Sequence, residues 1–427
     1  IVFPREPLIR VEGPLAVGQL LETCLLNLVN FPSLVATNAA RMRLAAGPDY
    51  QLLEFGLRRA QGPDGGITAS KYAYIGGFDG TSNVMAAKLT NIACKGTHAH
   101  AFVMTYSSLS ELKNRHAPAP KDGSPTVDFV ALCERKLKEL GFGETNEGEL
   151  AAFIAYAQAF PDGFLALVDT FDTINSGTKN FLGVAAALRD MGYRAQGVRL
   201  DSGDLAYLSK EVRLSFVQAD ETLGFKDYFS KMSIVASNDI NEAVLLELAR
   251  SGHEINAFGI GTHLVTCQKQ PALGCVYKLV EISGVPRIKL SQEVNKLTIP
   301  CRKTVYRLRG KNGAPIMDVI QRAIEPAPVA GARMLCRHPF QEQKRAHVVP
   351  SSVETLLYCV WDASNGLTES IKSLDEVREF SIDQVAKMRT DHLRPINPTP
   401  YKVAVSSGLY EYMHNLWMDE APISELS

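Results

Sequence analysis

The stretch YRAQGVRLDSGDLAYLSKEVRLSFVQA, from Tyr193 to Ala219, shows the pattern that decides the fold of this 427-residue chain. A short apolar run is followed by the polar cluster DSGD and then by a segment whose apolar residues recur at helical spacing. A strand that ends in polar residues and leads into a helix is the unit of a parallel sheet covered by helices. The stretch therefore predicts one strand-helix unit of an α/β domain.

Similar units recur on both sides of this stretch, at intervals of about 25 to 35 residues. They are FLALVDTFDT (164–173) before NFLGVAAALRDMG (180–192), MSIVASNDI (232–240) before NEAVLLELARSG (241–252), and INAFGIGTHLV (255–265). Asn238 or Asp239 can cap the helix that follows MSIVASNDI, and Gly252 can end it. Polar residues and glycines at successive strand ends are typical of the working rim of an α/β barrel.

The two ends of the chain have a different pattern. VYKLVEISGVPRIKLS (276–291) and TVYRLRGKNGAPIMDVI (304–320) alternate apolar and polar residues around a central turn, which predicts two β-hairpins. We therefore expect residues 1–50 and 276–427 to form a β-rich open-sandwich domain with C-terminal helices, and residues 51–275 to form the barrel. The alternating start IVFPREPLIRVEGPL predicts a strand entered partway, so we expect further residues upstream of Ile1.

Composition narrows the range of partners. Lys and Arg total 45 and Asp and Glu total 46, which gives a formal net charge of -1. The chain therefore has no large net charge that would attract nucleic acid or anionic lipid, and a small-molecule partner is favoured. We find no run of about 18 apolar residues that would span a bilayer. The 8 cysteines never form Cys-x-x-Cys, which argues against a zinc ribbon and a disulfide framework. A reducing compartment, the cytosol, is the expected location.

The stretch GTHAHAFVMTY (96–106) contains two histidines one residue apart, His98 and His100. Such a pair can clamp a metal, accept a phosphoryl group or pack inertly in a core. Residues two apart in a strand share a face, as a metal clamp requires. Here the pair precedes the apolar run AFVMTY, so it would lie at the wrong end of that strand, and neither His253 nor His263 is placed to complete a metal site. The metal reading is therefore disfavoured.

Cations and carboxylates gather at the predicted strand ends. In VRLDSGDL (198–205), Arg199 presents a planar fork suited to a carboxylate or phosphate, while Asp201 and Asp204 suit ribose hydroxyls or Mg²⁺. The structural alternative is a helix start at which Ser202 caps the helix and Asp204 favours its dipole. The sequence of this segment leaves both readings open.

Further anion-binding groups flank this segment. FGIGTHLV (258–265) and VASND (235–239) offer backbone amides, hydroxyls and glycines for a phosphate cradle. In EFGLRRAQGPDGG (54–66), Arg58 and Arg59 are adjacent, so in a strand only one can face the site and the other would be a structural salt-bridge partner. Together these groups suit a polyanionic sugar phosphate.

Six motifs, in order along the chain, resemble those of the nicotinate phosphoribosyltransferase family: LLEFGLRRAQGPDGG, GGFDGTSNV, GT-x-AH, GVRLDSGDL, VASND and GIGT-x-x-VTC-x-x-QPALGCVYKL. The resemblance runs from Val2 to at least Ile320 and fades past about Glu325. It implies a type II phosphoribosyltransferase fold, which is an irregular, TIM-like α/β barrel with an open β-rich domain. It also implies a homodimer whose active sites lie at the subunit interface.

The resemblance further implies the first step of NAD salvage from nicotinic acid. In that reaction phosphoribosyl pyrophosphate and nicotinate give nicotinate mononucleotide and pyrophosphate, with Mg²⁺ (or Mn²⁺ in its place) and with coupled hydrolysis of ATP. Such an enzyme is classed as a ligase or a transferase. Which residues would hold Mg²⁺ is not indicated.

Individual roles carry over only at matching positions. His100 matches a phosphoryl acceptor, and Asp201 lies where the ribose hydroxyls are expected; these two are the predicted catalytic residues. The predicted substrate-binding residues are Thr97 and Arg199 for nicotinate, with Arg199 facing its carboxylate, Arg58 for phosphoribosyl pyrophosphate, and Ser237, Asn238, Gly261 and Thr262 for the 5′-phosphate. The resemblance assigns no role to His98.

Three other functions stay open from the sequence. Nicotinamide phosphoribosyltransferase shares the fold and the sugar substrate, and a metal-dependent amidohydrolase would carry tightly bound zinc. A barrel that binds ligand without catalysis is the third, although the presence of His100, Arg199 and Asp201 favours an enzyme. The terminal stretch SSGLYEYMHNLWMDEAPISELS (406–427) is predicted to include a docking helix.

Overall fold

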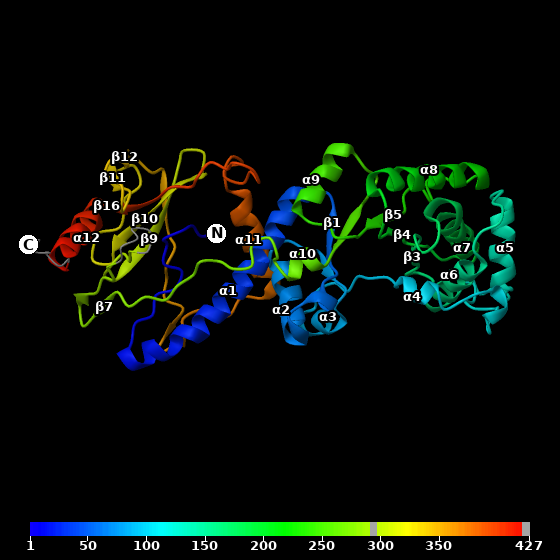
Figure 1. The fold of residues 1–427 in the computed structure, drawn as a ribbon, viewed down its shortest axis with the longest axis horizontal. Coiled ribbons are helices and arrows are strands. Elements are labelled where there is room, and N and C mark those ends of the chain that lie inside the picture. Colours follow the sequence, from blue (N-terminus) through cyan, green and yellow to red (C-terminus); the bar gives the residue numbers. More distant parts are fainter. Residues whose placement is uncertain (291–296, 421–427) are drawn as a thin grey trace, which may run out of the picture. The chain divides into compact units, whose positions relative to one another are not determined.

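The computed structural model describes residues 1–290 and 297–420 (Figure 1). The chain divides by contacts into two compact units. Unit 1 comprises Ile1–Ser33 and Ala272–Ser427, and unit 2 comprises Leu34–Pro271. The sequence placed the corresponding boundaries at 50/51 and 275/276.

Unit 2 is built on a six-stranded parallel sheet in the order β2-β1-β6-β5-β4-β3. Read as a circle, this is the order of the strands along the chain, as in a barrel. Among the described residues no pairing joins β2 to β3, so the ring is open at that one position. The strands are β1 (Gln51–Glu54), β2 (Gly80–Thr81), β3 (Leu165–Leu167), β4 (Gly197–Leu200), β5 (Ser233–Ala236) and β6 (Ala257–Ile260).

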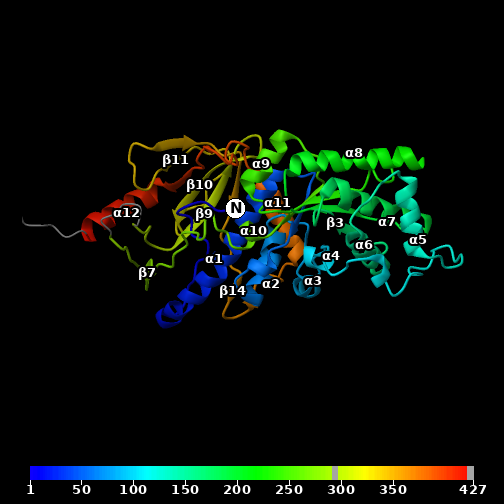
Figure 2. The same cartoon turned by 45° about the vertical axis from the view of Figure 1, so that its right-hand side comes forward.

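Helices follow each strand of unit 2, which confirms the predicted α/β class. The segment between β2 and β3 carries the α-helices α3 to α6. In this region α4 packs against α6 (Figure 2). The helices are α2 (Gly62–Ile75), α3 (Val84–Thr90), α4 (His100–Val103), α5 (Phe129–Glu139), α6 (Glu147–Ala159), α7 (Thr178–Asp190), α8 (Leu205–Leu223), α9 (Glu242–Ser251) and α10 (Thr262–Val265). The run AFVMTY, expected to be a strand, instead begins inside the single turn α4.

Two helix starts differ in detail from the sequence expectation. Helix α9 is capped by Asn241, which accepts hydrogen bonds from the amides of Ala243 and Val244, and not by Asn238 or Asp239. Those two residues have left-handed φ angles of 128° and 46° and belong to the turn that leaves β5. Gly252 ends α9 with φ 70°, as predicted.

Helix α8 starts at the end of the DSGD cluster. Its N-cap is Asp204, whose carboxylate accepts from the amide of Tyr207 at 3.0 Å. Ser202, the predicted cap, instead donates its hydroxyl to Asp169. Asp204 is therefore structural, and Asp201 is the carboxylate of this cluster that remains near Arg199.

Helix α1 (Leu15–Ala46) runs from unit 1 into unit 2. Its second half buries Val35, Ala39, Met42 and Ala46. Gly76 packs against it so closely that a Cβ there would lie 2.5 Å from the Ala36 carbonyl oxygen. This packing is the reason that residues 34–46 group with unit 2.

By length and composition alone, α1 is the one helix among the described residues that could cross a membrane, contrary to the sequence expectation. Its most apolar window has a mean hydropathy of 1.3, and 6% of that window is buried. The core helix of a soluble protein, which is mostly buried, and a signal sequence near the N-terminus pass the same test. Polar residues of α1 also make packing contacts, since Asn38 donates to the carbonyls of His263 and Leu264 and Arg41 pairs with Glu242.

Unit 1 contains a mixed six-stranded sheet in the order β12-β11-β16-β10-β9-β13. The expected hairpins are confirmed as the antiparallel pairs β9-β10 and β7-β8, whereas β10 and β16 run parallel. The elements are β7 (Glu281–Ile282), β8 (Val285–Pro286), β9 (Lys303–Arg309), β10 (Pro315–Arg322), β11 (Met334–Arg337), β12 (Arg345–Val348), β13 (Ser352–Thr355), β14 (Trp361–Asp362), β15 (Gly366–Leu367), α11 (Leu374–Ala386), β16 (Val403–Ser406) and α12 (Ser407–Glu420).

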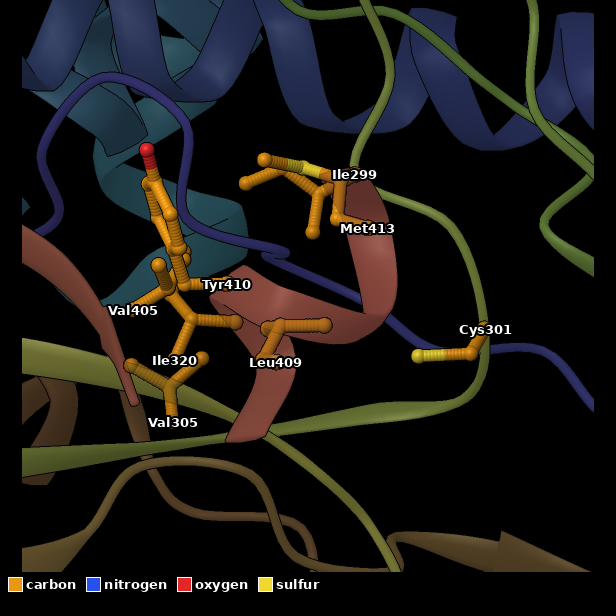
Figure 3. Packing of buried hydrophobic residues seen from close by; sticks show 8 residues of the cluster. All are labelled: Ile299, Cys301, Val305, Ile320, Val405, Leu409, Tyr410 and Met413. Atoms are coloured by element: carbon orange, nitrogen blue, oxygen red, sulfur yellow. The ribbon is translucent and has the colours of Figure 1, made fainter. Parts of the chain in front are cut away.

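Residues 1–14 form no strand, so the strand expected at the start of the chain is wrong. Pro4, Pro7 and Pro14 interrupt this segment, and proline cannot donate to a strand ladder. At the other end of unit 1, α12 packs Leu409, Tyr410 and Met413 into the core of the sheet (Figure 3). The docking helix is thus confirmed for residues up to 420, and 421–427 lie outside the described residues.

A buried carboxyl group on α6 holds the segment that follows β3. Glu149 is fully buried, and its Oε2 accepts from Ser176 Oγ at 2.6 Å and from Asn180 Nδ2 at 3.1 Å. Its Oε1 has no partner. Burial raises the pKa of Glu149 to about 7, and the nearby carboxylates of Asp172 and Asp169 add to this effect.

We predict that Glu149→Gln stabilises the protein at high pH. The native state holds the Glu149 proton more tightly than the unfolded state does, so its contribution to stability is complete below about pH 4.5 and is lost as the pH rises through about 7. Glutamine cannot ionise, so the variant should gain about 2 to 3 kcal/mol over the native protein at pH 8 and less than about 1 kcal/mol at pH 5. Denaturant unfolding at the two pH values measures this difference. The exposed Glu144→Gln is the control, and an equal effect of Glu149→Gln at both pH values would contradict the prediction.

Candidate active site

The candidate site lies at the carboxyl ends of neighbouring strands of unit 2. Asp169 follows β3, Asp201 follows β4 and Ser237 follows β5. The parallel register pairs Leu167 with Arg199, and Leu200 with Ala236, so these strand ends meet at one edge. The C-terminal edge of a parallel barrel is where enzyme sites of this architecture are built.

Arg199 is the most constrained cation at this edge. Its Nε donates to Ser237 Oγ at 2.7 Å, its Nη2 to Asp201 Oδ1 at 3.1 Å and its Nη1 to the His98 carbonyl at 3.3 Å. Ser237 also donates to Asp201, which closes a ring of contacts. Since a guanidinium has five N–H groups, two remain for a ligand. The side chain is 15% exposed, and its guanidinium carbon lies 5.6 Å from the centre of the Phe55 ring.

His100 is held by a buried carboxylate. Its Nε2 lies 3.1 Å from Oδ1 of Asp169, whose side chain is only 1% exposed. Oδ2 of Asp169 accepts from the Asp201 amide at 3.0 Å and from the Ser202 hydroxyl. An ionised carboxylate can only accept, so Nε2 of His100 donates to it, and in the neutral imidazole the lone pair then lies on Nδ1. The half-exposed imidazole therefore presents a nucleophilic nitrogen.

Thr97 and His98 are fixed to the backbone of β3. Thr97 Oγ1 donates to the Leu165 carbonyl at 2.7 Å, and the Leu167 amide donates to His98 Nε2 at 3.1 Å. Burial lowers the pKa of His98 to about 4, and the positive charge of Arg199 acts in the same direction. His98 is therefore neutral at physiological pH, which lets its Nε2 accept.

The remaining predicted residues lie at the same edge but outside this network. Arg58 and Arg59 lie in a 3₁₀ turn (Leu57–Arg59), not in a strand, and both are exposed. In the part of the chain that the structure describes, neither forms an ion pair, so the expected salt-bridge partner is not found. Asn238 is exposed, and Gly261 and Thr262 begin α10 after β6. No contact joins the side chains of Arg58, Asn238 or Thr262 to those of Arg199 or His100.

A buried carboxylate, that of Glu54, holds the start of the turn that carries Arg58. Glu54, 1% exposed at the end of β1, accepts from Ser70 Oγ at 2.7 Å and from Thr81 Oγ1 at 2.6 Å. It also accepts from the Gly56 amide, which opens the turn. Neither Glu54 nor Asp169 was predicted to have a role in the site. Asp169 follows the apolar run FLALV as Asp201 follows GVRL, so the same strand-end pattern could have indicated it.

The carboxylates at this edge do not form a protein metal site. No group of three or more His, Cys, Asp or Glu side chains among residues 1–290 and 297–420 is arranged to hold a metal ion. Both oxygens of Asp169 are occupied, and Oδ1 of Asp201 contacts Arg199 and Ser237. The His98 ring faces β3 while His100 faces Asp169, which also disfavours the histidine clamp.

Comparisons with known proteins agree on one family. The model of the nicotinate phosphoribosyltransferase (NAPRTase) family matches residues 50–315, and that of the nicotinate phosphoribosyltransferase C-terminal domain matches residues 302–413. Nicotinate phosphoribosyltransferase 1 of Arabidopsis thaliana is 55% identical over 435 residues, which cover 100% of this chain and 78% of that protein. The Homo sapiens nicotinate phosphoribosyltransferase is 46% identical over 430 residues, with coverages of 99% and 79%. The crystal structure of human nicotinic acid phosphoribosyltransferase superposes with a TM-score of 0.84 at 44% identity, covering 95% of this chain and 78% of that one.

We predict that Asp169→Asn changes the tautomer of His100. The asparagine oxygen is expected to stay with the Asp201 amide, because an N–H group cannot accept there, which turns the Asn N–H₂ toward His100. The His100 Nε2 must then accept, and its proton moves to Nδ1. Nitrogen and carbon chemical shifts of labelled histidine report this exchange. Asp172→Asn, an exposed change on the same loop, should leave the His100 signals unchanged, and an unaltered Nε2–H form in Asp169→Asn would contradict the geometry.

Proposed function

The chain belongs to the nicotinate phosphoribosyltransferase family, and from this premise we propose how its own residues perform the transfer. It is a transferase enzyme of NAD biosynthesis, which moves the phosphoribosyl group of phosphoribosyl pyrophosphate to nicotinate. The products are nicotinate mononucleotide and pyrophosphate. We assign the active site to this edge of unit 2 because of Arg199. Three hydrogen bonds hold its guanidinium at the end of β4, and two of its N–H groups remain for a ligand.

Arg199 recognises the nicotinate carboxylate. A guanidinium and a carboxylate can form paired, charge-assisted hydrogen bonds. Because Ser237, Asp201 and the His98 carbonyl fix the fork before substrate arrives, little rotational freedom is lost on binding. A neutral amide gains less from this cation, so we assign nicotinate and not nicotinamide as the preferred acceptor.

The chemical step needs electrostatic stabilisation and no general base. The pyridine nitrogen of nicotinate carries its own lone pair and forms the new bond to the anomeric carbon, while the bond from that carbon to pyrophosphate breaks. Positive charge develops on the ribose and negative charge on the leaving group. We assign the exposed Arg58 to the pyrophosphate, Asp201 to the ribose hydroxyls, and Asn238, Gly261 and Thr262 to the 5′-phosphate. Ser237 also lies at this end, although its hydroxyl is bonded to Arg199 and Asp201.

The residues of this site fit a Mg²⁺ ion that binds together with the substrate phosphates, and not an ion held by the protein alone. Magnesium commonly keeps several waters and binds through one or two carboxylates together with substrate phosphates. Only Oδ2 of Asp201 lacks a contact among the carboxylate oxygens of Asp169 and Asp201. We propose that Asp201 would hold the ion with this oxygen, and that bound Mg²⁺ would supply positive charge to the pyrophosphate.

ATP is coupled to the reaction through His100. The lone pair of Nδ1 attacks the terminal phosphorus of ATP and the bond to the ADP oxygen breaks, while the Nε2 proton stays on the imidazole in its hydrogen bond to Asp169. The phosphohistidine adds a dianion beside the pyrophosphate region. This dianion orders the cationic and Mg²⁺-bearing groups around the substrate, which is how the energy of ATP is used.

We also propose a homodimer in the cytosol. Tyr207, Leu214 and Val217 form an exposed apolar stripe on α8, which a second copy of the chain would cover. The 8 cysteines are all free, which is consistent with a reducing compartment. The runner-up function from another class, a silent ligand-binding homologue, is disfavoured because His100, Arg199 and Asp201 are retained together.

We predict that the protein releases pyrophosphate from phosphoribosyl pyrophosphate with nicotinate, and that ATP increases the rate. The measurement compares nicotinate and nicotinamide as acceptors, each with and without ATP. Arg199 should favour nicotinate by about tenfold or more in kcat/KM. A preference for nicotinamide would overturn the substrate assignment, and no release with either acceptor would favour the silent homologue.

We predict that His100→Ala abolishes ATP stimulation. The variant lacks the nitrogen that accepts the phosphoryl group, so only slow ATP-independent turnover should remain, and labelled phosphate from ATP should not be incorporated. His116→Ala, which removes an exposed histidine of the 114–128 loop, is the control. Undiminished stimulation in His100→Ala would exclude a phosphohistidine mechanism.

A further inference from the structure

The opening between β2 and β3 leaves one edge of β3 without a neighbouring strand. On the paired edge, Phe164 and Val168 exchange backbone hydrogen bonds with the strand β4 region. The backbone N–H and C=O groups of successive residues in a strand point to opposite edges. Those of Leu165 and Leu167 therefore point to the open edge. Polar backbone groups at such an edge need partners.

Two side chains take the place of the missing strand. Thr97 Oγ1 donates to the Leu165 carbonyl at 2.7 Å, and His98 Nε2 accepts from the Leu167 amide at 3.1 Å. Adjacent residues of one segment thus satisfy an acceptor and a donor two residues apart on β3. This is the pairing that a parallel strand would have made with its backbone.

The surroundings of His98 suit this role as acceptor. Its ring centroid lies 5.0 Å from that of Tyr156, 5.4 Å from Phe102 and 6.1 Å from Phe153. This aromatic enclosure keeps the ring neutral, in line with the lowered pKa of His98. An apolar residue would fill the enclosure but would leave the Leu167 amide without a partner.

His98 is also connected to Arg199 and to the segment that carries His100. Its backbone carbonyl accepts from Arg199 Nη1 at 3.3 Å. His100, two residues further on, contacts Asp169, which lies two residues past Leu167. The segment 97–100 is therefore attached to β3 and to Arg199 at the same time.

We infer that His98 is a positioning residue, whose imidazole fixes the segment 97–100 to the open edge of β3 and whose carbonyl thereby sets the direction of Arg199. The inference rests on the proposed function, in which Arg199 binds the nicotinate carboxylate. His98 itself touches neither substrate. Loosening it should weaken nicotinate binding more than it slows the chemical step.

His253 offers a matched control within the same unit. Its Nδ1 accepts from the Ile255 amide at 3.1 Å, and its ring lies 5.2 Å from Tyr50 and 5.6 Å from Phe258. Burial lowers its pKa, as for His98. It precedes β6, however, and so lies at the opposite end of the strands from the candidate site.

The experiment compares His98→Leu, His98→Gln and His253→Leu with the native enzyme. KM for nicotinate and kcat are measured at saturating phosphoribosyl pyrophosphate, together with the midpoint of thermal unfolding. His98→Leu should raise KM for nicotinate about tenfold with kcat changed less than about threefold, because the Leu167 amide loses its partner. His98→Gln, whose amide oxygen can reach the Nε2 position, should restore KM to within about threefold. His253→Leu should lower the unfolding midpoint without changing KM.

A KM in His98→Leu equal to that of His253→Leu would overturn the inference. If His98→Leu does not fold, His98→Asn and His98→Gln replace it: only the shorter asparagine should raise KM, and equal values would overturn it. A native enzyme without phosphoribosyl transfer would instead refute the proposed function. In that case hydrogen exchange of the Leu167 amide still tests His98, since equal protection in His98→Gln and His98→Asn would refute the anchoring.

Discussion

The open edge of β3 is the constraint on which the candidate site depends. A parallel sheet that closes fully satisfies every strand edge, but this sheet stops between β2 and β3, where backbone groups must find partners elsewhere. Thr97 and His98 supply them. The same segment brings His100 to the end of β3, so the contacts that satisfy the backbone of β3 also position the residue proposed as the phosphoryl acceptor.

Asp169 and Arg199 connect the remaining strand ends into one network. Asp169 accepts hydrogen bonds from the His100 imidazole, the Asp201 amide and the Ser202 hydroxyl. It therefore links the end of β3 to the loop after β4. Arg199 links β4 to Ser237 after β5. A buried carboxylate is tolerable only when its hydrogen-bonding capacity is filled, and two of the groups that fill it here belong to His100 and Asp201, to which we assign functional roles. Structural and functional demands on these residues therefore coincide.

Much of this architecture could be predicted because local pattern carries it. Arg199, Asp201 and Ser237 lie at the ends of apolar runs, and the strand-helix alternation gave the parallel sheet. Asp169 was missed although its local pattern is the same, because its partner His100 lies 69 residues away and that pairing has no local signal. The run AFVMTY was too short for periodicity to separate a strand from a helical turn. Among Asn238, Asp239 and Asn241, residue type alone could not select the cap of α9, since all three can accept from backbone amides.

The charge arrangement explains how phosphorylation of His100 could act on the rest of the site. The free site pairs two basic side chains with one carboxylate each, His100 with Asp169 and Arg199 with Asp201. A phosphoryl group on Nδ1 would add nearly two negative charges close to Asp169, whose side chain is almost completely buried. Like charges in such surroundings repel strongly, so the phosphorylated state gains most from groups that bring positive charge, namely Mg²⁺ with its pyrophosphate and the exposed Arg58. Substrate binding and phosphorylation would then favour each other. The phosphoryl group adds negative charge, and the Mg²⁺ that arrives with the pyrophosphate adds positive charge, so each offsets the charge that the other brings.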